Sequence, residues 1–234
     1  MKTVVLASLA GLALASVASA QISIVNNIPG SFVDITGTGT SLGLNGDDSS
    51  AALAVPAGFG NAVLAAGAGV VSTNGRYNLA PGSTAFSNTA LVTGAGNQGY
   101  YPYWDDLRTD TAGSNVYSQI VGDAFIVQWN ATFFNSGAPI RMQIQIFNAA
   151  GQLAHGGALA QYLYAPSTAG ALGYDGASAT VGAIDDQGNI AEWSFNTPGS
   201  VIPGQTVLSI VQVPAPGAAA MLGLGGLIVG RRRR

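Results

Sequence analysis

Residues 141–146 read RMQIQI and alternate strictly between polar and apolar side chains. Successive side chains of a β-strand point to opposite faces of its sheet. Met142, Ile144 and Ile146 therefore share one face, and the polar side chains share the other. The alternation predicts a half-buried strand, with its apolar face in the core and its polar face in solvent.

A β-hairpin is predicted just before this strand. Residues 116–121 and 124–129 are rich in β-branched and aromatic side chains, and the pair Gly-Asp at 122–123 separates them. Two such runs joined by a two-residue turn are typical of a hairpin. In the second run, the side chains expected on one face are Phe125, Val127 and Trp129.

Short runs of this kind recur along the chain, with turn residues about every ten positions and no amphipathic helix between them. The spacing indicates an all-β fold over residues 21–211, either an antiparallel β-sandwich or a related barrel. We expect one domain; a division near Gly99 is the alternative. The other expected strands are 32–35, 62–64, 69–72, 90–93, 159–164, 179–184, 191–195 and 206–211, and residues 148–151 are an expected turn.

The first 20 residues have the pattern of a secretory signal peptide. Lys2 supplies the charged start and an apolar run follows over residues 4–17. Ala18 and Ala20 are the small residues that signal peptidase requires before its cleavage site. The run is short for a membrane-spanning helix, so we expect cleavage and a mature chain that begins at Gln21.

The other end, residues 213–234, reads VPAPGAAAMLGLGGLIVGRRRR. Its apolar part would make a helix of only ~21 Å, against a hydrocarbon core of ~30 Å. Basic residues that flank an apolar segment stay on the cytoplasmic side of a membrane. We therefore expect transient insertion into the inner membrane, with four basic residues inside: Arg231, Arg232, Arg233 and Arg234.

This order of features resembles the PEP-CTERM sorting signal of Gram-negative bacteria, in its planctomycete style. Val213, Pro214 and Pro216 match the usual Val-Pro-Glu-Pro, and Ala215 stands where glutamate is usual. The resemblance implies sorting by an exosortase-type enzyme to the cell envelope or extracellular matrix, with residues 212–234 as the signal. The alternative, a C-terminal helix with a solvated basic tail, is disfavoured because both prolines oppose a helix.

Between the two signals the chain is strongly acidic. Residues 21–213 keep three arginines and no lysine against all 11 acidic residues of the chain, a net charge of −8. Such a surface does not hold a phosphate backbone, which excludes nucleic acid as a partner. Cysteine is absent from the chain, so neither disulfides nor thiolate chemistry is available.

Four short motifs along this acidic body resemble a known module. They are STNG at 72–75, YPYWDDL at 101–107, FIVQW at 125–129 and ATVG at 179–182. In this order they are similar to the all-β module of bacterial exported surface proteins that is related to the nidogen-type extracellular domain. The resemblance covers residues 32–209 and implies an adhesion or matrix module without a catalytic centre.

Asp105 and Asp106 are the most prominent polar pair. Paired carboxylates in a turn hold Ca²⁺ through oxygen ligands, so both are candidate calcium ligands. The alternative is that one carboxylate caps the turn and the other is solvated. The acidic stretches at 45–48 and 185–189 are interpreted as hairpin turns, and no other cofactor is expected.

Aromatic side chains gather beside this pair, and two interpretations stay open for them. They stack on sugar rings, or they form the rim of the sandwich core. The first gives an alternative function, a protein that binds or cleaves exopolysaccharide with Asp105, Asp106 or Glu192. His155 is the only histidine and is interpreted as a loop residue. The four aromatic residues are Tyr100, Tyr101, Tyr103 and Trp104.

These observations favour a non-enzymatic, exported structural or adhesion protein of the cell surface or extracellular matrix. Its expected partners are signal peptidase, an exosortase-type enzyme and exopolysaccharide.

Overall fold

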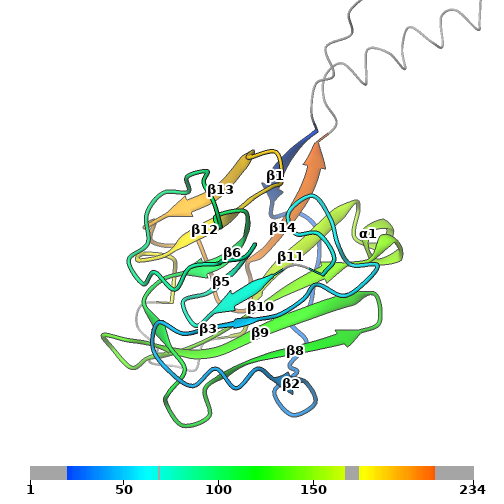
Figure 1. Cartoon of the computed structure of the whole chain (residues 1–234). Helices are drawn as coiled ribbons and strands as arrows, with labels where there is room; N and C mark the ends of the chain where they lie inside the picture. The colour runs from blue at the N-terminus through cyan, green and yellow to red at the C-terminus, as the bar shows by residue number, and fades with distance from the viewer. Residues whose placement is uncertain (1–19, 68, 167–173, 214–234) are drawn as a thin grey trace, which may run out of the picture. The chain divides into compact units, whose positions relative to one another are not determined.

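Two antiparallel β-sheets contain nearly all the regular structure in the computed structural model, which describes residues 20–67, 69–166 and 174–213 (Figure 1). The predicted all-β class is confirmed. The larger sheet has the order β1-β14-β11-β10-β9-β8-β2, with β7 paired to β9, and the smaller has the order β13-β12-β6-β5-β4-β3.

The larger sheet contains the longest strands of the described chain. Its members are β1 (Gln21–Val25), β2 (Thr40–Ser41), β7 (Leu107–Arg108), β8 (Asn115–Val121), β9 (Ala124–Phe133), β10 (Pro139–Phe147), β11 (Ala158–Tyr164) and β14 (Val207–Val213). The smaller sheet is made of β3 (Ser50–Ala52), β4 (Val70–Ser72), β5 (Arg76–Asn78), β6 (Gly99–Trp104), β12 (Thr180–Ile184) and β13 (Ile190–Phe195).

The main core is built from the alternating side chains of the predicted strands. Phe125, Val127 and Trp129 of β9 point into it together with Met142 and Ile144 of β10, as the alternation predicted. The turn at 122–123 closes the β8–β9 hairpin, in which Val121 pairs with Ala124. The hairpin prediction is therefore confirmed.

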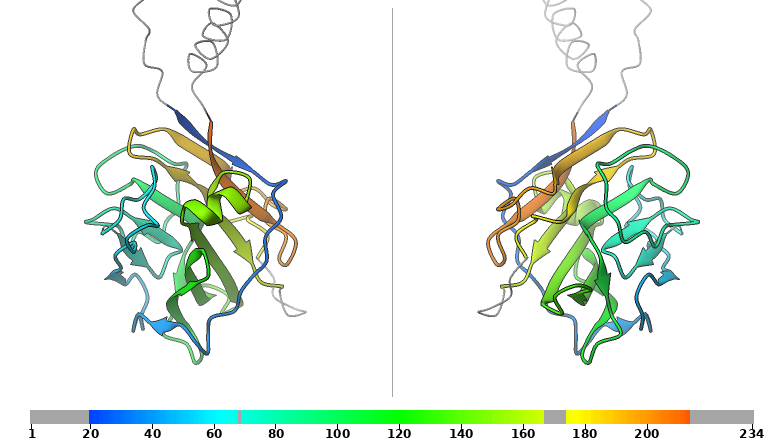
Figure 2. Two further views of the ribbon diagram at one scale, coloured as in Figure 1. Left: turned by 90° about the vertical axis from the view of Figure 1, so that its right-hand side faces the viewer. Right: turned by 90° about the vertical axis from the view of Figure 1, so that its left-hand side faces the viewer.

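The polar face of β10 is buried as well, so the prediction of a half-buried strand is wrong. Gln143 is fully buried and Gln145 is 6% exposed. Residues 28–36, which we call the strap, lie against this outer face of the larger sheet and cover it. Figure 2 shows the strap in blue, running along the outer side of the green strands.

Three predicted strands are absent, and each has a local cause. Residues 32–35 belong to the strap, whose main chain bonds to glutamine side chains instead of a neighbouring strand. Residues 62–64 are held in a bend by the side chain of Asn61, which accepts from the N–H of Val63 at 3.0 Å. Residues 90–93 form a loop, where the Leu91 N–H donates to the carboxylate of Glu192.

A short helix replaces the turn expected at residues 148–151. α1 (Ala149–Ala154) begins after Asn148, whose side-chain oxygen accepts from the Gly151 N–H at 2.9 Å. This is the ordinary N-cap interaction of asparagine. The predicted turn residues are thus the start of one helical turn and a half.

The two ends of the body lie side by side because β1 pairs with β14. Gln21 pairs with Val213, and Ile22 pairs with Gln212. Residues 212–213 are therefore part of the sheet, which extends two residues past the expected end of the body at residue 211. The described residues contain no helix with the length and apolar character needed to cross a membrane.

The residues of the expected export and sorting signals lie largely outside the described residues. This holds for Ala18 in the expected signal peptide and for the sorting residues Pro214, Pro216, Arg231, Arg232, Arg233 and Arg234. Residues 21–213 form one compact unit.

Candidate functional site

The four motifs of the acidic body meet inside the fold. Asn74 of STNG is fully buried, and its side-chain oxygen accepts from the Leu107 N–H of YPYWDDL at 2.8 Å. Trp129 of FIVQW donates its indole N–H to the carbonyl of Ser72 at 2.8 Å. Thr180 of ATVG pairs with Trp104. Buried polar groups need such partners, so the motifs join the two sheets.

The aromatic cluster lies in the core and offers no ring face to a sugar. Tyr100 and Tyr103 are fully buried, Tyr101 is 1% exposed and Trp104 is 7% exposed. Burial raises the pKa of Tyr100 and of Tyr103 well above the ordinary value. This burial does not favour glycan contacts. Tyr100 and Tyr103 belong to the main core, whereas Tyr101 and Trp104 belong to a separate buried cluster.

Arg76 fills the space between two of these rings. Its guanidinium lies 5.1 Å from the ring centre of Tyr101 and 4.4 Å from that of Trp104. Its Nε donates to the side-chain oxygen of Asn78 at 3.2 Å. Ring faces and an amide thus hold this buried cation.

Asp105 caps the turn between β6 and β7, which was the alternative to calcium binding. One oxygen accepts from the Asp106 N–H at 2.8 Å and the other accepts from the Ser178 hydroxyl at 2.6 Å. Burial raises the pKa of Asp105. Burial, followed by the nearby charges of Asp47 and Asp48, raises the pKa of Asp106.

The acidic turn at 45–48 thus lies near Asp106. The sequence did not predict that these two acidic stretches come together. A direct bond joins the two loops, because the Thr109 N–H donates to the Gly46 carbonyl at 2.8 Å. Within the described ranges, however, no three acidic or histidine side chains are grouped so that they could hold a metal ion. Asp105 uses one carboxylate oxygen to cap the turn and the other to accept from Ser178.

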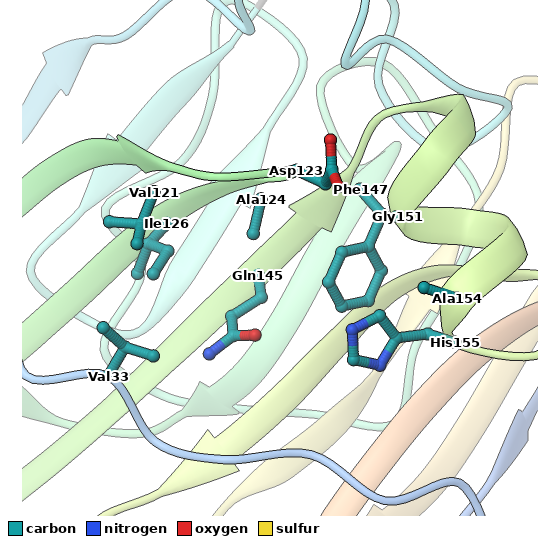
Figure 3. A pocket seen from close by; sticks show the side chains of 10 residues that line it. All are labelled: Val33, Val121, Asp123, Ala124, Ile126, Gln145, Phe147, Gly151, Ala154 and His155. Atoms are coloured by element: carbon teal, nitrogen blue, oxygen red, sulfur yellow. The ribbon is translucent and has the colours of Figure 1, made fainter.

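A shallow pocket of about 230 Å³ lies between the strap, the β8–β9 turn and α1 (Figure 3). His155 lies at its edge, stacked on Phe147 with ring centres 4.2 Å apart and planes 9° from parallel. Val33 of the strap and Gln145 of β10 line the opposite part. His155 is therefore the C-cap residue of α1 packed on an aromatic ring, in line with its interpretation as a connecting residue.

Glutamine side chains from three neighbouring strands fix the strap to the larger sheet. Gln161 of β11 donates to the carbonyl of Pro29 at 3.2 Å, and Gln145 of β10 donates to that of Ser31 at 2.8 Å. Further along the strap, the Gln143 side chain of β10 bonds to both main-chain groups of Val33. It accepts from the Val33 N–H at 3.3 Å and donates to the Val33 carbonyl at 3.2 Å.

The strap ends in a polar cluster of five side chains, which we call the strap cluster. Arg141 forms an ion pair with Asp34. The hydroxyl of Thr36 donates to Asp34 Oδ1 at 2.5 Å, and this bond is the largest cause of a strongly lowered pKa of Asp34. Gln128 and Asn130 of β9 complete the cluster.

Sequence reasoning missed the strap cluster because its members are far apart in the chain. Thr36 and Gln128 are separated by 92 residues. The usable signal was the run of glutamines at alternate positions of adjacent predicted strands, since Gln128 pairs with Gln143 and Gln145 pairs with Gln161. Chemically, the cluster brings together a hydroxyl, a carboxylate, a guanidinium and two amides.

Comparison with known families gave one result. A family model described as NIDO related matches residues 24–220. Searches of curated proteins and of solved structures found no significant match.

Proposed function

Because this chain belongs to the NIDO-related, or nidogen-related, family, we propose that it is an exported structural or adhesion protein of the cell surface or extracellular matrix. In this proposal the body, residues 21–213, is the functional unit. The two end segments act only in transport. Signal peptidase removes the first, and an exosortase-type enzyme acts on the second.

The pairing of Gln21 with Val213 is the observation that carries the proposal. Gln21 is the first residue after the expected signal-peptidase site, and Val213 is the last residue before Pro214. β1 thus begins at the expected signal-peptidase site, and β14 ends two residues inside the expected sorting signal of residues 212–234. Removal of either end segment leaves every strand pair of the described chain intact.

The surface chemistry of the body supports an extracellular role. Arg76 is buried, Arg108 pairs with Asp110 and Arg141 pairs with Asp34, so all three cations of the body are engaged. The unpaired excess of carboxylates disfavours a polyanionic partner such as nucleic acid. The core stands without disulfides, which suits a chain that lacks cysteine.

The experiment expresses the full chain in a Gram-negative bacterium that carries an exosortase, and follows it in inner-membrane, surface and medium fractions. Two variants test the tail. Replacement of all four terminal arginines by glutamine removes the charge that holds the apolar segment. Replacement of Pro214 and Pro216 by alanine keeps that charge and changes the proposed recognition sequence.

The wild-type protein is expected at the surface in processed form. The arginine variant should escape to the medium without processing, and the proline variant should accumulate unprocessed in the membrane. If both variants reach the surface with the wild-type mature mass and yield, the sorting proposal is wrong.

A further inference from the structure

The strap cluster places a hydroxyl next to a side-chain amide in a defined orientation. Thr36 Oγ lies 3.0 Å from Gln128 Nε2, which is one bond away from the amide carbon Cδ. Gln128 is fully buried, and Thr36 is half-buried. Gln128 is therefore shielded from water, whereas the contact of Thr36 with Asp34 is exposed.

The amide of Gln128 is oriented as an electrophile. Its Oε1 accepts from the Ile35 N–H at 3.0 Å, and its Nε2 lies 3.0 Å from Asp34 Oδ1. These two partners fix which end of the amide is oxygen and which is nitrogen. A backbone N–H at the carbonyl oxygen stabilises the negative charge that develops when a nucleophile adds to Cδ.

The hydroxyl of Thr36 contacts both the carboxylate that would take its proton and the amide nitrogen that would leave. It donates to Asp34 Oδ1 at 2.5 Å, so the proposed proton acceptor is in contact with it, but the lowered pKa of Asp34 makes this carboxylate a weak base and the reaction slow. Three N–H donors surround its oxygen: Asn130 Nδ2 at 2.9 Å, Gln128 Nε2 at 3.0 Å and Arg141 at 3.5 Å. Donors around an oxygen favour the negative charge that appears as its proton leaves.

We propose that Thr36 and Gln128 form an intramolecular ester cross-link with release of ammonia. Thr36 Oγ gives its proton to Asp34 and bonds to Gln128 Cδ, and the carbonyl electrons move to Oε1 beside the Ile35 N–H. The carbonyl then re-forms, the Cδ–Nε2 bond breaks, and the proton on Asp34 passes to the leaving nitrogen. A hydroxyl and an amide become an ester and ammonia, with no change in oxidation state and no cofactor.

Such a bond would take the place of a disulfide in this protein. The chain has no cysteine, so a disulfide is not available to fasten the strap. An ester between Thr36 and Gln128 would close a loop of 92 residues and join the strap covalently to β9. Cross-links that close long loops act chiefly by restricting the unfolded chain.

The chain also contains a matched pair that lacks these features. Thr38 lies two residues further along and donates its hydroxyl to Gln119 Oε1 at 2.8 Å. Its hydroxyl donates to the amide oxygen instead of to a carboxylate. The same two residue types therefore occur close by in an arrangement that we expect to stay unreacted.

Trypsin separates the two partners cleanly, because the body contains only the arginines 76, 108 and 141 and no lysine. Thr36 falls in peptide 21–76 and Gln128 in peptide 109–141. The full chain is purified, digested and examined by tandem mass spectrometry. Cyclisation of an N-terminal Gln21 also releases ammonia, but it cannot join two peptides. Hydroxylamine cleaves esters and leaves that lactam intact.

We expect a joined peptide that has lost one ammonia and that hydroxylamine separates. It should persist in Thr36→Ser and in the matched control Thr38→Val, and disappear in Thr36→Val. In Asp34→Asn the joined peptide should form ~100-fold more slowly, at the low end for general-base catalysis. Two separate peptides from the folded wild-type protein, or a joined peptide in Thr36→Val, would overturn the proposal.

Discussion

At the scale of single residues, the fold depends on polar side chains that behave as core residues. Glutamine side chains form hydrogen bonds with main-chain N–H and carbonyl groups of the strap. Elsewhere in the sheet, a neighbouring strand supplies these partners. Gln143 is the clearest case, because it is fully buried and bonds both polar groups of Val33. A buried donor or acceptor that loses such a partner destabilises the folded state.

Replacement of Gln143 by leucine therefore should destabilise the protein. The change leaves the Val33 N–H and carbonyl and one Gln145 bond without partners, and we expect a loss of about 1–3 kcal/mol. Chemical denaturation measures the free energy of unfolding. Gln187→Leu, in an exposed turn, is the control and should stay within about 0.5 kcal/mol of wild type. Equal effects in the two variants would show that the strap is not held in this way.

Asp105 gives a pH-dependent prediction. Burial raises its pKa in the folded state above the ordinary value of 3.8, so the folded state binds a proton more readily than the unfolded state does. The stability contribution of this group therefore falls as pH rises from about 4 through the folded pKa. At neutral pH the buried, ionised carboxylate lowers the stability of the folded state.

Asp105→Asn removes that penalty while keeping an oxygen for the Asp106 N–H. The free energy of unfolding of the variant minus that of the wild type should be larger at pH 7 than at pH 4, which means that the variant gains stability as pH rises. Denaturant titrations at both pH values measure the difference. A difference that stays constant, or grows as pH falls, would contradict the assigned role of burial.

The same residues show what the sequence reveals and what it leaves hidden. Met142, Ile144 and Ile146 were predicted in the core from alternation alone, and the prediction is confirmed. Gln143 and Gln145 were predicted in solvent, because alternation identifies two faces but not what covers the second. The missing information is tertiary: residues more than 100 positions earlier supply the cover.

At the scale of elements, strands that bond to neighbouring strands were predictable and segments held by side chains were not. The β8–β9 hairpin and the paired strands β10 and β11 have strong local signals in alternation and turn residues. The strap and the bend at Asn61 have apolar runs of similar composition, yet their main chains bond to side chains. Composition alone does not separate the two cases.

The contact between the STNG and YPYWDDL motifs can be tested at Gly75, in the turn between β4 and β5. Gly75 has φ +68°, and an added Cβ would lie 2.0 Å from the carbonyl oxygen of Tyr103. Gly122 in the β8–β9 turn has φ +56° with open space around it. Gly122→Ala therefore carries only the left-handed penalty, about 1 kcal/mol, whereas Gly75→Ala should cost a further 1–3 kcal/mol, roughly, from overpacking.

Thermal and denaturant unfolding of the two glycine variants measures that difference. A Gly75→Ala protein as stable as Gly122→Ala would mean that the STNG and YPYWDDL motifs are not in close contact at this point. The comparison isolates the clash, because both positions share the unfavourable backbone conformation.

At the scale of the whole molecule, the body is expected to be self-sufficient. Residues 21–213 include every strand of the two sheets and form one compact unit. This segment, produced alone, should give a circular dichroism spectrum dominated by β-structure and unfold cooperatively without any added ion. A spectrum dominated by helix, or loss of the fold with a chelator, would contradict the account.

The central claim is that the body is exported and that both end segments serve transport. The most direct test is the intact mass of the protein isolated from the surface of the producing cell. We expect the mass of a chain that begins at Gln21, or at its cyclised form, and that lacks the four terminal arginines. A surface protein that still carries Met1 and ends at Arg234 would contradict it.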